Sequence, residues 1–336
     1  MNRAIPALLG VAILSGVALA SYRDMFLPPD PLPGQPETAI VDITEGMTLR
    51  QVAELLARHR LVRSDWGFVA LGKWSGVERR LPSGEYQLRA GMAPEAILQH
   101  LAGGHVLTHA VTIPEGYTVT QIADLLDAKG ITDKEEFLRL AADPEFAKTL
   151  GVEAGSLEGY LFPNTYQFAK QSHAKTVIQA MVGELQKAVL PEWAARAAEI
   201  GMTFHQVLTL ASVIEKETGV GAERPLISAV FHNRLRRHIP LQSDPTVIYG
   251  IPHFTGNLTR RDLETPTAYN TYRKAGLPPG PIASPGADSI HAALYPVPTS
   301  FLYFVSRNDG THHFSATLAE HNKAVNYFQK RHGRMS

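Results

Sequence analysis

Glu215 is the residue whose type and position best suit acid–base chemistry. It lies at the end of an almost entirely apolar run, residues 207–214, within a helix that the sequence predicts over residues 203–217. Helical spacing places Glu215 on the same face as Leu208 and Ala211. Burial of a carboxyl group on such a face raises its pKa. A glutamate that keeps its proton near neutral pH can act as a general acid, as one does in glycosidases.

The same residues allow a structural role for Glu215. Lys216 and Glu217 follow it directly, which indicates that the helix emerges into solvent there. Glu215 would then be solvated and paired with a lysine. A hydrolytic mechanism would also need a second carboxylate about 5–9.5 Å from the first. The acidic residues that could supply it are Glu217, Asp244, Asp262 and Glu264.

Polar and aromatic side chains gather in the loop-forming segments after this helix. Segments 241–250 and 263–272 each contain a proline, which stiffens the backbone. Their hydroxyl, amide and aromatic groups suit sugar hydroxyls and amides. For Asp244 and Asn270 the alternative is loop capping, which both residue types commonly perform. The predicted substrate-binding residues are Gln242, Ser243, Asp244, Thr246, Tyr249, Tyr269, Asn270 and Tyr272.

Other kinds of site are excluded by residue type and spacing. The chain has no cysteine, so disulfides, thiolate metal sites and cysteine nucleophiles are all excluded. Residues 301–315 predict a β-hairpin that turns at Asn308-Asp309-Gly310. His312 and His313 are adjacent in one of its strands and would point to opposite faces. The sequence has no H-E-x-x-H motif, nucleophile elbow, Walker loop or dinucleotide fingerprint. We therefore predict neither a metal nor a cofactor.

Length and composition describe a globular protein of more than one domain. The 336 residues suggest about two domains. Hydrophobic residues make up 44% and charged residues 19%, which leaves ample apolar material for a core. The formal net charge is +0 and no long basic or acidic run occurs. The electrostatic footprint of a nucleic-acid-binding protein is therefore missing.

An internal repeat precedes the apolar helix. Residues 41–56 and 111–126 match without a gap at an offset of 70. Each copy has an alternating V-x-I segment typical of a short strand, then a Glu-Gly turn. A threonine follows in each, Thr48 or Thr118, which suits the N-cap of a helix with one apolar face. Each copy therefore predicts a strand, a turn and a helix.

A second, weaker sequence match follows each copy of the repeat. Residues 86–88 (YQL) and 166–168 (YQF) match at an offset of 80, each followed by an apolar pair. Each unit should therefore be strand, helix, strand, helix. The repeat pattern resembles a LysM module, a class that binds chains containing N-acetylglucosamine. Because the copies lack the polar tail of a complete module, an inert α+β spacer is the alternative.

The N-terminus predicts export. Residues 1–3 are short and positive, and residues 4–22 run for 19 residues without a charge, about the length that spans a bilayer as a helix. The positive end stays inside, so most of the chain would lie outside the cytoplasm. Ala18-Leu19-Ala20 resembles a signal-peptide cleavage site, but the span is longer than a usual signal-peptide core. We favour an uncleaved anchor, followed by a stiff proline-rich linker over residues 27–38.

Several longer motifs, in one order, resemble a single family. They are EGYLFPNTY (158–166), ASVIEKET (211–218), FHNRL (231–235), LQSDPTVIYG (241–250), LETPTAYNTY (263–272), GLPPGPIASPGADSIHAAL (276–294), LYFV (302–305) and EHN (320–322). Over roughly residues 40–330, together with the N-terminal span, the chain resembles the endolytic murein transglycosylase family, also called YceG-like. The resemblance implies that Glu215 is the catalytic glutamate.

The resemblance also implies a chemistry. Lytic transglycosylases protonate the glycosidic oxygen between N-acetylmuramic acid (MurNAc) and N-acetylglucosamine (GlcNAc). The 6-hydroxyl of MurNAc then attacks its own C1, which leaves a 1,6-anhydro end. Because the attack is intramolecular, one carboxyl group can serve as acid and then as base. The alternatives are a non-catalytic peptidoglycan-binding scaffold and a glycan hydrolase that uses a second carboxylate.

The implied role is internal cleavage of nascent glycan strands at the cell inner membrane, which terminates their elongation. The partners would be glycan strands and penicillin-binding proteins, with the N-terminus cytoplasmic and the catalytic part outside. We predict an α+β chain with a transmembrane helix, a LysM-like repeat domain and a mixed α+β catalytic domain around a buried helix. Its predicted parts are the tip and anchor (1–24), linker (25–40), repeat unit one (41–110), repeat unit two (111–190) and catalytic domain (191–330).

Overall fold

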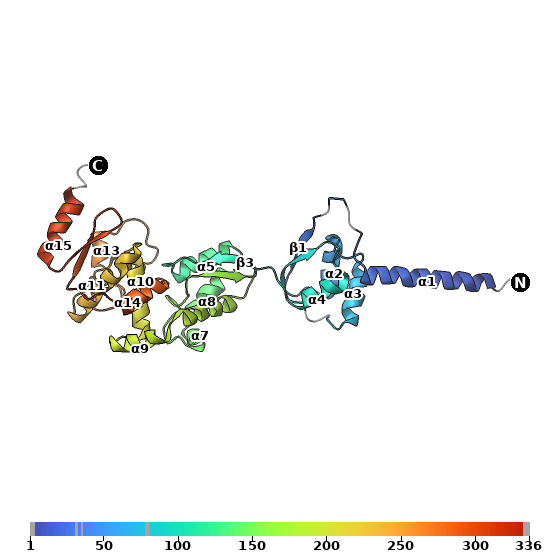
Figure 1. The fold of residues 1–336 in the computed structure, drawn as a ribbon, viewed down its shortest axis with the longest axis horizontal. Coiled ribbons are helices and arrows are strands. Elements are labelled where there is room, and N and C mark those ends of the chain that lie inside the picture. The colour runs from blue at the N-terminus through green and yellow to red at the C-terminus, as the bar shows by residue number, and fades with distance from the viewer. Residues whose placement is uncertain (1–3, 31–32, 35, 78–80, 332–336) are drawn as a thin grey trace. The chain divides into compact units, whose positions relative to one another are not determined.

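The structure, a computed structural model, describes residues 4–30, 33–34, 36–77 and 81–331, with side chains for those from residue 15 to residue 329. The chain divides into two compact units. The first comprises Met1–Ala110 with Gln167–Gln171, and the second comprises Val111–Tyr166 with Ser172–Ser336. Helices and small two-stranded sheets make up both units, which confirms the predicted α+β class (Figure 1).

The first unit is built on the first copy of the repeat. Its elements are α1 (Ala4–Phe26), β1 (Thr38–Ile43), α2 (Leu49–Arg58), α3 (Asp65–Trp74), β2 (Gly84–Arg89) and α4 (Pro94–Ala102). Strands β1 and β2 pair antiparallel, with Val41 opposite Tyr86. Both side chains are fully buried in a core that includes Val52, Leu56 and Ile97. The alternating and helical apolar positions of the repeat therefore face one another, as their periodicity predicts.

The second unit begins with the second copy of the repeat. The elements of this copy are β3 (His109–Thr112), α5 (Val119–Ala128), α6 (Lys134–Ala141), α7 (Pro144–Thr149), β4 (Thr165–Phe168) and α8 (Ala174–Ala188). Residues 109–110 of β3 and 167–168 of β4 belong to the first unit. Strands β3 and β4 pair, as β1 and β2 do. Between helix and second strand, copy one inserts α3, whereas copy two inserts α6 and α7. The sequence analysis did not predict these inserted helices.

The predicted N-caps at Thr48 and Thr118 are confirmed, and two further threonines cap helices in the same way. Thr48, Thr118 and Thr203 each accept a hydrogen bond from the backbone N–H of a glutamine three residues on, whose side chain returns to the threonine N–H. Thr317 forms the same reciprocal cap with Glu320. Each cap satisfies donors that the first turn of a helix leaves unpaired. The N-cap threonine and the residue three positions later therefore determine where each of the four helices begins.

The rest of the second unit surrounds one buried helix. The elements are α9 (Pro191–Glu199), α10 (Phe204–Glu217), a short 3-10 turn (Gly221–Glu223), α11 (Arg224–Arg236), α12 (Asp244–Tyr249), α13 (Arg260–Glu264), α14 (Ala287–Leu294), β5 (Tyr303–Ser306), β6 (His312–Ser315), α15 (Leu318–Val325) and a π-helical turn (Asn326–Arg331). Helix α10 packs against α9, α11 and α14 (Figure 1), and also against α12. Strands β5 and β6 form the predicted hairpin, in which Phe304 pairs with Phe314.

The predicted membrane anchor falls on helix α1, whose side chains are described only from residue 15. The positive tip, residues 1–3, lies outside the described residues. Within the part of the chain that the structure describes, no single helix is long and apolar enough to cross a membrane. Helices α9 and α10 pass that test only as a pair, bent by 93°. The structure does not confirm the anchor, which stays a prediction.

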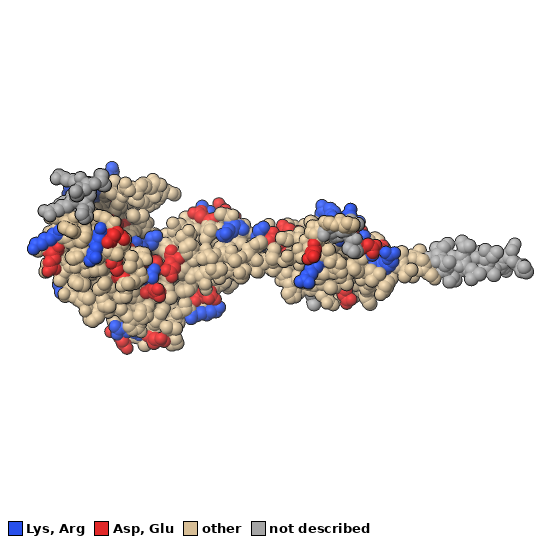
Figure 2. Space-filling view, turned by 45° about the horizontal axis from the view of Figure 1, so that its top comes forward, with Lys and Arg blue, Asp and Glu red and all other residues tan. Residues whose placement is uncertain are grey.

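Charged side chains are mixed over the visible surface. On the face that Figure 2 shows, lysine and arginine (blue) are interspersed with aspartate and glutamate (red). Neither sign of charge forms an extended patch on that face. This distribution matches the balanced composition of 32 basic and 32 acidic residues.

Candidate active site

Glu215 lies in the last turn of α10, at the edge of the core. The residues from Val207 to Ile214 are all buried, and the side chain of Glu215 keeps only 7% of its exposure. Glu215 is therefore not solvated, and its ion-pair partner is an arginine, Arg224, rather than a lysine. Packing of the buried residues of α10 therefore fixes the position of this carboxylate.

The loop before α14 lies along α10 and reaches Glu215. His205 Nε2 is 3.1 Å from the carbonyl oxygen of Pro279. The N–H of Ile282 donates to Ser212 Oγ at 3.0 Å. The N–H of Gly286 then donates to Glu215 Oε2 at 3.1 Å. Gly286 is the N-cap of α14, so Glu215 satisfies a donor at the positive end of that helix.

Arg224 contacts three carboxylates, one of which is that of Glu215. Its Nη2 is 3.2 Å from Glu215 Oε1 and 3.3 Å from Glu115 Oε2. Its Nη1 is 3.4 Å from Asp288 Oδ2. The side chains of Arg224 and Glu215 are 12% and 7% exposed, whereas those of Glu115 and Asp288 are 48% and 83% exposed. A single guanidinium nitrogen thus joins Glu215 to a second glutamate.

Glu115 belongs to the Glu-Gly turn of the second repeat, which pairs with the loop before α14. The N–H of Gly116 donates to Ser284 O, and the N–H of Ser284 donates to Tyr117 O, both at 2.8 Å. Lys216 Nζ donates to Gly116 O at 3.1 Å. Burial, and then the negative charge of Glu215, raise the pKa of Glu115. Sequence reasoning missed Glu115 as a site residue, although the repeated Glu-Gly pair was its signal.

Glu217 lies two residues beyond Glu215 and faces a different neighbourhood. Ser243 Oγ donates to it at 2.5 Å, and burial raises the pKa of Glu217 to about 7. Beside it is a cavity of about 260 Å³. The lining residues are Glu217, Arg234, Leu241, Gln242, Asp244, Tyr272, Phe304 and His321. The structure thus brings together three predicted binding residues, Gln242, Asp244 and Tyr272, and Tyr272 donates to Asp244 at 2.6 Å.

Tyr249 and Tyr269 form a separate cluster with Glu158. Their ring centroids are 4.8 Å apart in an edge-on contact. Tyr249 donates its hydroxyl to Glu158 at 3.1 Å, as does the N–H of Val119 at the start of α5. Burial raises the pKa of Glu158 to about 7. Sequence reasoning quoted the segment that contains Glu158 but did not single this residue out.

Three predicted binding residues lie in the interior. Ser243, Thr246 and Asn270 are at most 1% exposed. The amide nitrogen of Asn270 donates to the carbonyls of Leu263 and Thr265, and its oxygen accepts the N–H of Tyr272. Thr246 Oγ1 donates to Ser243 O at 2.7 Å. For Asn270 these bonds match the loop-capping alternative.

Two of the acidic residues considered for hydrolysis form contacts within α13 and its N-cap. Asp262 accepts hydrogen bonds from the backbone and hydroxyl of Thr259, the N-cap of that helix. Glu264 pairs with Arg260 at 3.1 Å across one turn and is 62% exposed. Both contacts are local, so these side chains have a sufficient structural role within their own helix.

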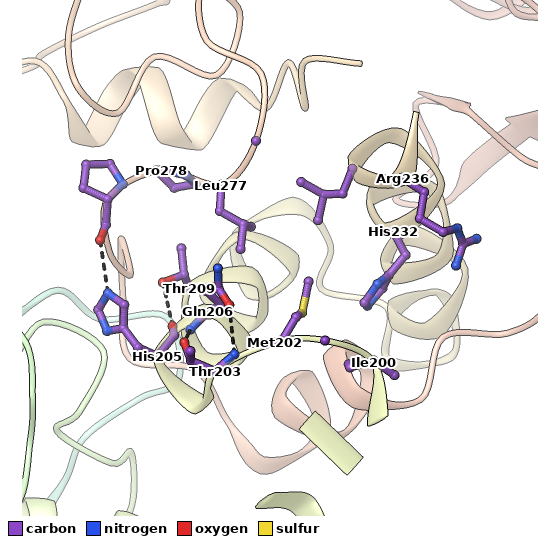
Figure 3. A pocket seen from close by; sticks show the side chains of 14 residues that line it. Ile200, Met202, Thr203, His205, Gln206, Thr209, His232, Arg236, Leu277 and Pro278 are labelled. Carbon is purple, nitrogen blue, oxygen red and sulfur yellow. Dashed lines mark hydrogen bonds between the residues drawn. The ribbon is translucent and has the colours of Figure 1, made fainter. Parts of the chain in front are cut away.

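A larger cavity lies at the opposite end of α10 from Glu215. Its volume is about 660 Å³. As Figure 3 shows, its wall includes Thr203 and Gln206 in the first turn of α10, His232 and Arg236 of α11, and the loop at Leu277. None of the predicted substrate-binding residues lines it.

Comparison with known proteins identifies the family. The family model described as the YceG-like family matches residues 41–327. The chain belongs to the YceG-like family. This YceG-like chain is 34% identical to a protein of Bacillus subtilis (strain 168) named endolytic murein transglycosylase, over 85% of this chain and 84% of that protein.

Two further relatives agree. A protein of Streptococcus pneumoniae serotype 2 (strain D39 / NCTC 7466) with the same name is 29% identical, and the match covers 96% of this chain but 64% of that longer protein. A crystal structure of a yceG-like protein from Listeria monocytogenes superposes with a TM-score of 0.60 at 33% identity, covering 85% of this chain and 98% of that one.

Proposed function

We propose that this protein is an endolytic murein transglycosylase, a lyase that cleaves the MurNAc–GlcNAc bond of peptidoglycan and leaves a 1,6-anhydro-MurNAc end. The observation that carries the proposal is family membership at 34% identity to a protein of that name over most of both chains. In this proposal Glu215 is the general acid and then the general base. Its support is the position of Glu215 in the ASVIEKET motif, at the edge of the buried part of α10.

The surroundings of Glu215 suit both halves of that role. Glu215 gives its proton to the glycosidic oxygen as the bond from that oxygen to C1 of MurNAc breaks. Negative charge then develops on Glu215, where the Gly286 N–H and the Arg224 guanidinium already point. Preorganised donors of this kind stabilise a developing charge without reorganisation. When the C6 hydroxyl attacks C1, the same carboxylate accepts the hydroxyl proton and the acid is restored.

The polar cavity beside Glu217 is the proposed binding site for a neighbouring sugar. Gln242, Asp244 and Tyr272 offer an amide, a carboxylate and a phenol within about 260 Å³. Such groups match the hydroxyls and acetamides of a glycan, and Tyr272 adds an aromatic face. Tyr249 and Tyr269 supply a second aromatic surface.

We further propose that the two repeat units bind glycan as LysM-like modules and that α1 anchors the chain in the inner membrane with its N-terminus in the cytoplasm. Cleavage would then occur outside the cytoplasm, close to the bilayer where strands emerge. Cutting a nascent strand there would terminate its elongation, with penicillin-binding proteins as partners. The uncharged, mainly apolar stretch over residues 4–22 supports the anchor.

Hydrolysis is the second candidate reaction, because one observation favours it. Glu115 Oε2 and Glu215 Oε1 both lie within 3.3 Å of Arg224 Nη2. Because both oxygens contact one nitrogen, the distance between them is at most 6.5 Å. Paired carboxylates about 5–9.5 Å apart are the arrangement of glycoside hydrolases. A hydrolase would release ordinary reducing ends, whereas the lyase releases anhydro ends.

The test is cleavage of nascent glycan strands by the purified full-length protein and its Glu215→Gln variant. Glutamine keeps the shape of the side chain but cannot donate an acidic proton, so we expect a loss of about 10²–10⁴-fold in rate. Glu264→Gln, on the exposed face of α13, is the matched control and should cleave as the wild type does. Full activity of Glu215→Gln, together with loss in Glu217→Gln, would move the acid to Glu217 and contradict the proposal.

A further inference from the structure

We propose that Glu115, in the turn of the second repeat, is a positioning residue for Glu215 and acts through Arg224. The inference rests on the proposed role of Glu215 as the acid. Arg224 Nη2 donates to both glutamates, at 3.2 Å to Glu215 and 3.3 Å to Glu115. The two carboxylates therefore share the positive charge of one guanidinium nitrogen. Glu115 thus sets how much of that charge acts on Glu215 and where the guanidinium lies against it.

The turn that carries Glu115 is built into the catalytic half of the chain. Gly116 is buried, and its backbone is bonded to Ser284 and to Lys216. A Cβ added at Gly116 would lie 3.6 Å from Glu215 Cγ. A Cβ added at Gly286 would lie 1.9 Å from Glu115 Oε1. The Glu115 carboxylate therefore packs directly against the residue whose N–H holds Glu215.

The matching turn of the first repeat shows no such arrangement. Glu45 and Gly46 occupy the equivalent positions, at the offset of 70, and both are exposed. A Cβ added at Gly46 would meet no atom within 4 Å. The two copies share a sequence pattern, but only the second places its glutamate beside Arg224. The contact is thus a feature of the site and not a general requirement of the repeat fold.

Glu115 is the principal counter-charge among the groups that surround the pair. The charged neighbours are Arg224, Asp288 and Lys216. Asp288 also contacts Arg224, but it is 83% exposed against 48% for Glu115, so water screens Asp288 more. Lys216 adds a second positive charge near the turn, and the negative charge of Glu115 partly offsets it. Burial and the charge of Glu215 raise the pKa of Glu115, as expected for two carboxylates that share one cation.

The test is the pH profile of kcat/KM for the full-length protein and its Glu115→Gln variant. Removal of the Glu115 charge leaves Arg224 committed to Glu215, so the alkaline limb should move to lower pH by about one unit. The rate at pH values above the limb should fall about tenfold, while the rate in acid stays close to wild type. Glu115→Asp keeps the charge and should restore most of the wild-type profile. Glu264→Gln, an exposed change on α13, is the control and should leave the profile unmoved.

Two results would overturn the inference. An alkaline limb that stays in place in Glu115→Gln would show that Glu115 does not act on the acid. A loss by the same factor at every pH would indicate a purely structural or binding role. Glu215→Gln is assayed in parallel. If Glu215→Gln is inactive while Glu115→Gln shows no shift, only this inference fails, whereas an active Glu215→Gln removes the proposed function as well.

Discussion

The hydroxyl of Ser243 donates to the carboxylate of Glu217 at 2.5 Å, two residues beyond Glu215 on the same helix. The last turn of α10 therefore carries two carboxyl groups in different surroundings. Glu215 faces a guanidinium and the N-terminus of α14. Glu217 has a hydroxyl donor, and its burial raises its pKa to about 7. Substitution of the two groups should therefore have different effects.

The stability of the fold should fall as the pH rises from about 4.5 to about 7. Glu217 ordinarily titrates at 4.5, but in the folded chain its pKa is about 7, so the native state binds more protons in that window. The free energy of unfolding then decreases with pH, and the loss is complete above the native pKa. Glu217→Gln cannot lose a proton, so it should be about 3 kcal/mol more stable than wild type at pH 8 and close to it at pH 4.5. Chemical denaturation at the two pH values measures this difference.

Glu158 provides an independent check of the same effect, because burial raises its pKa to about 7 as well. Glu158→Gln should flatten the pH dependence of stability in the same direction. Glu264→Gln, an exposed glutamate on α13, should leave the slope as it is. Equal slopes for the wild type and for both buried-site variants would mean that neither carboxyl group keeps its proton near neutral pH.

The predicted binding residues should separate into two groups on substitution. Tyr272 lines the cavity beside Glu217, so Tyr272→Phe should raise KM by up to about tenfold through loss of one hydrogen bond. Thr246 is 0% exposed and donates to Ser243 O, so Thr246→Val should cost about 1–3 kcal/mol of unfolding free energy. KM values and denaturation curves for both variants make the comparison. A large rise in KM for Thr246→Val with unchanged stability would place Thr246 at the substrate instead.

Gly286→Ala should reproduce the effect of removing the charge of Glu115. The φ angle of Gly286 is −75°, which alanine adopts without strain. The new Cβ would lie 1.9 Å from Glu115 Oε1, so the flexible Glu115 side chain must move away from Arg224. The N–H that holds Glu215 is retained. We therefore expect an alkaline limb shifted to lower pH, with little change in unfolding free energy.

Gly155→Ala is the matched control for this steric change. A Cβ added at Gly155 meets no atom within 4 Å, so neither the profile nor the stability should respond. A Gly286→Ala protein with the wild-type pH profile would show that displacement of Glu115 has no effect on the acid.

Local sequence chemistry predicted the elements of the fold well. The capping threonines, the repeated strand and helix, and the hairpin near Asn308 all depend on residues within a few positions of one another. Side-chain periodicity and cap geometry operate over that range, so these features can be recognised without knowledge of the tertiary structure. The inserted helices α3, α6 and α7 were not predicted. Copy one has a single inserted helix and copy two has two, so the repeat pattern gave no guide to them.

The site could be predicted only where one segment carried the signal. Glu215 stands out because its own helix is apolar. The contact between Arg224 and Glu115 joins residues 109 positions apart, which no local pattern encodes. Burial of Thr246 and Asn270 was likewise beyond prediction, since the same polar residue types line binding sites and cap buried loops. Tertiary packing determines which of these roles each residue takes.

Analysis of the glycan ends tests the central claim most directly. Nascent peptidoglycan strands are digested with the purified full-length protein and with its Glu215→Gln variant, and the products are measured by mass spectrometry. The proposed function predicts internal fragments with 1,6-anhydro-MurNAc ends, lighter by one water than reducing ends and missing from the variant digest. Ordinary reducing ends from the wild type, or anhydro ends from the variant, would contradict it.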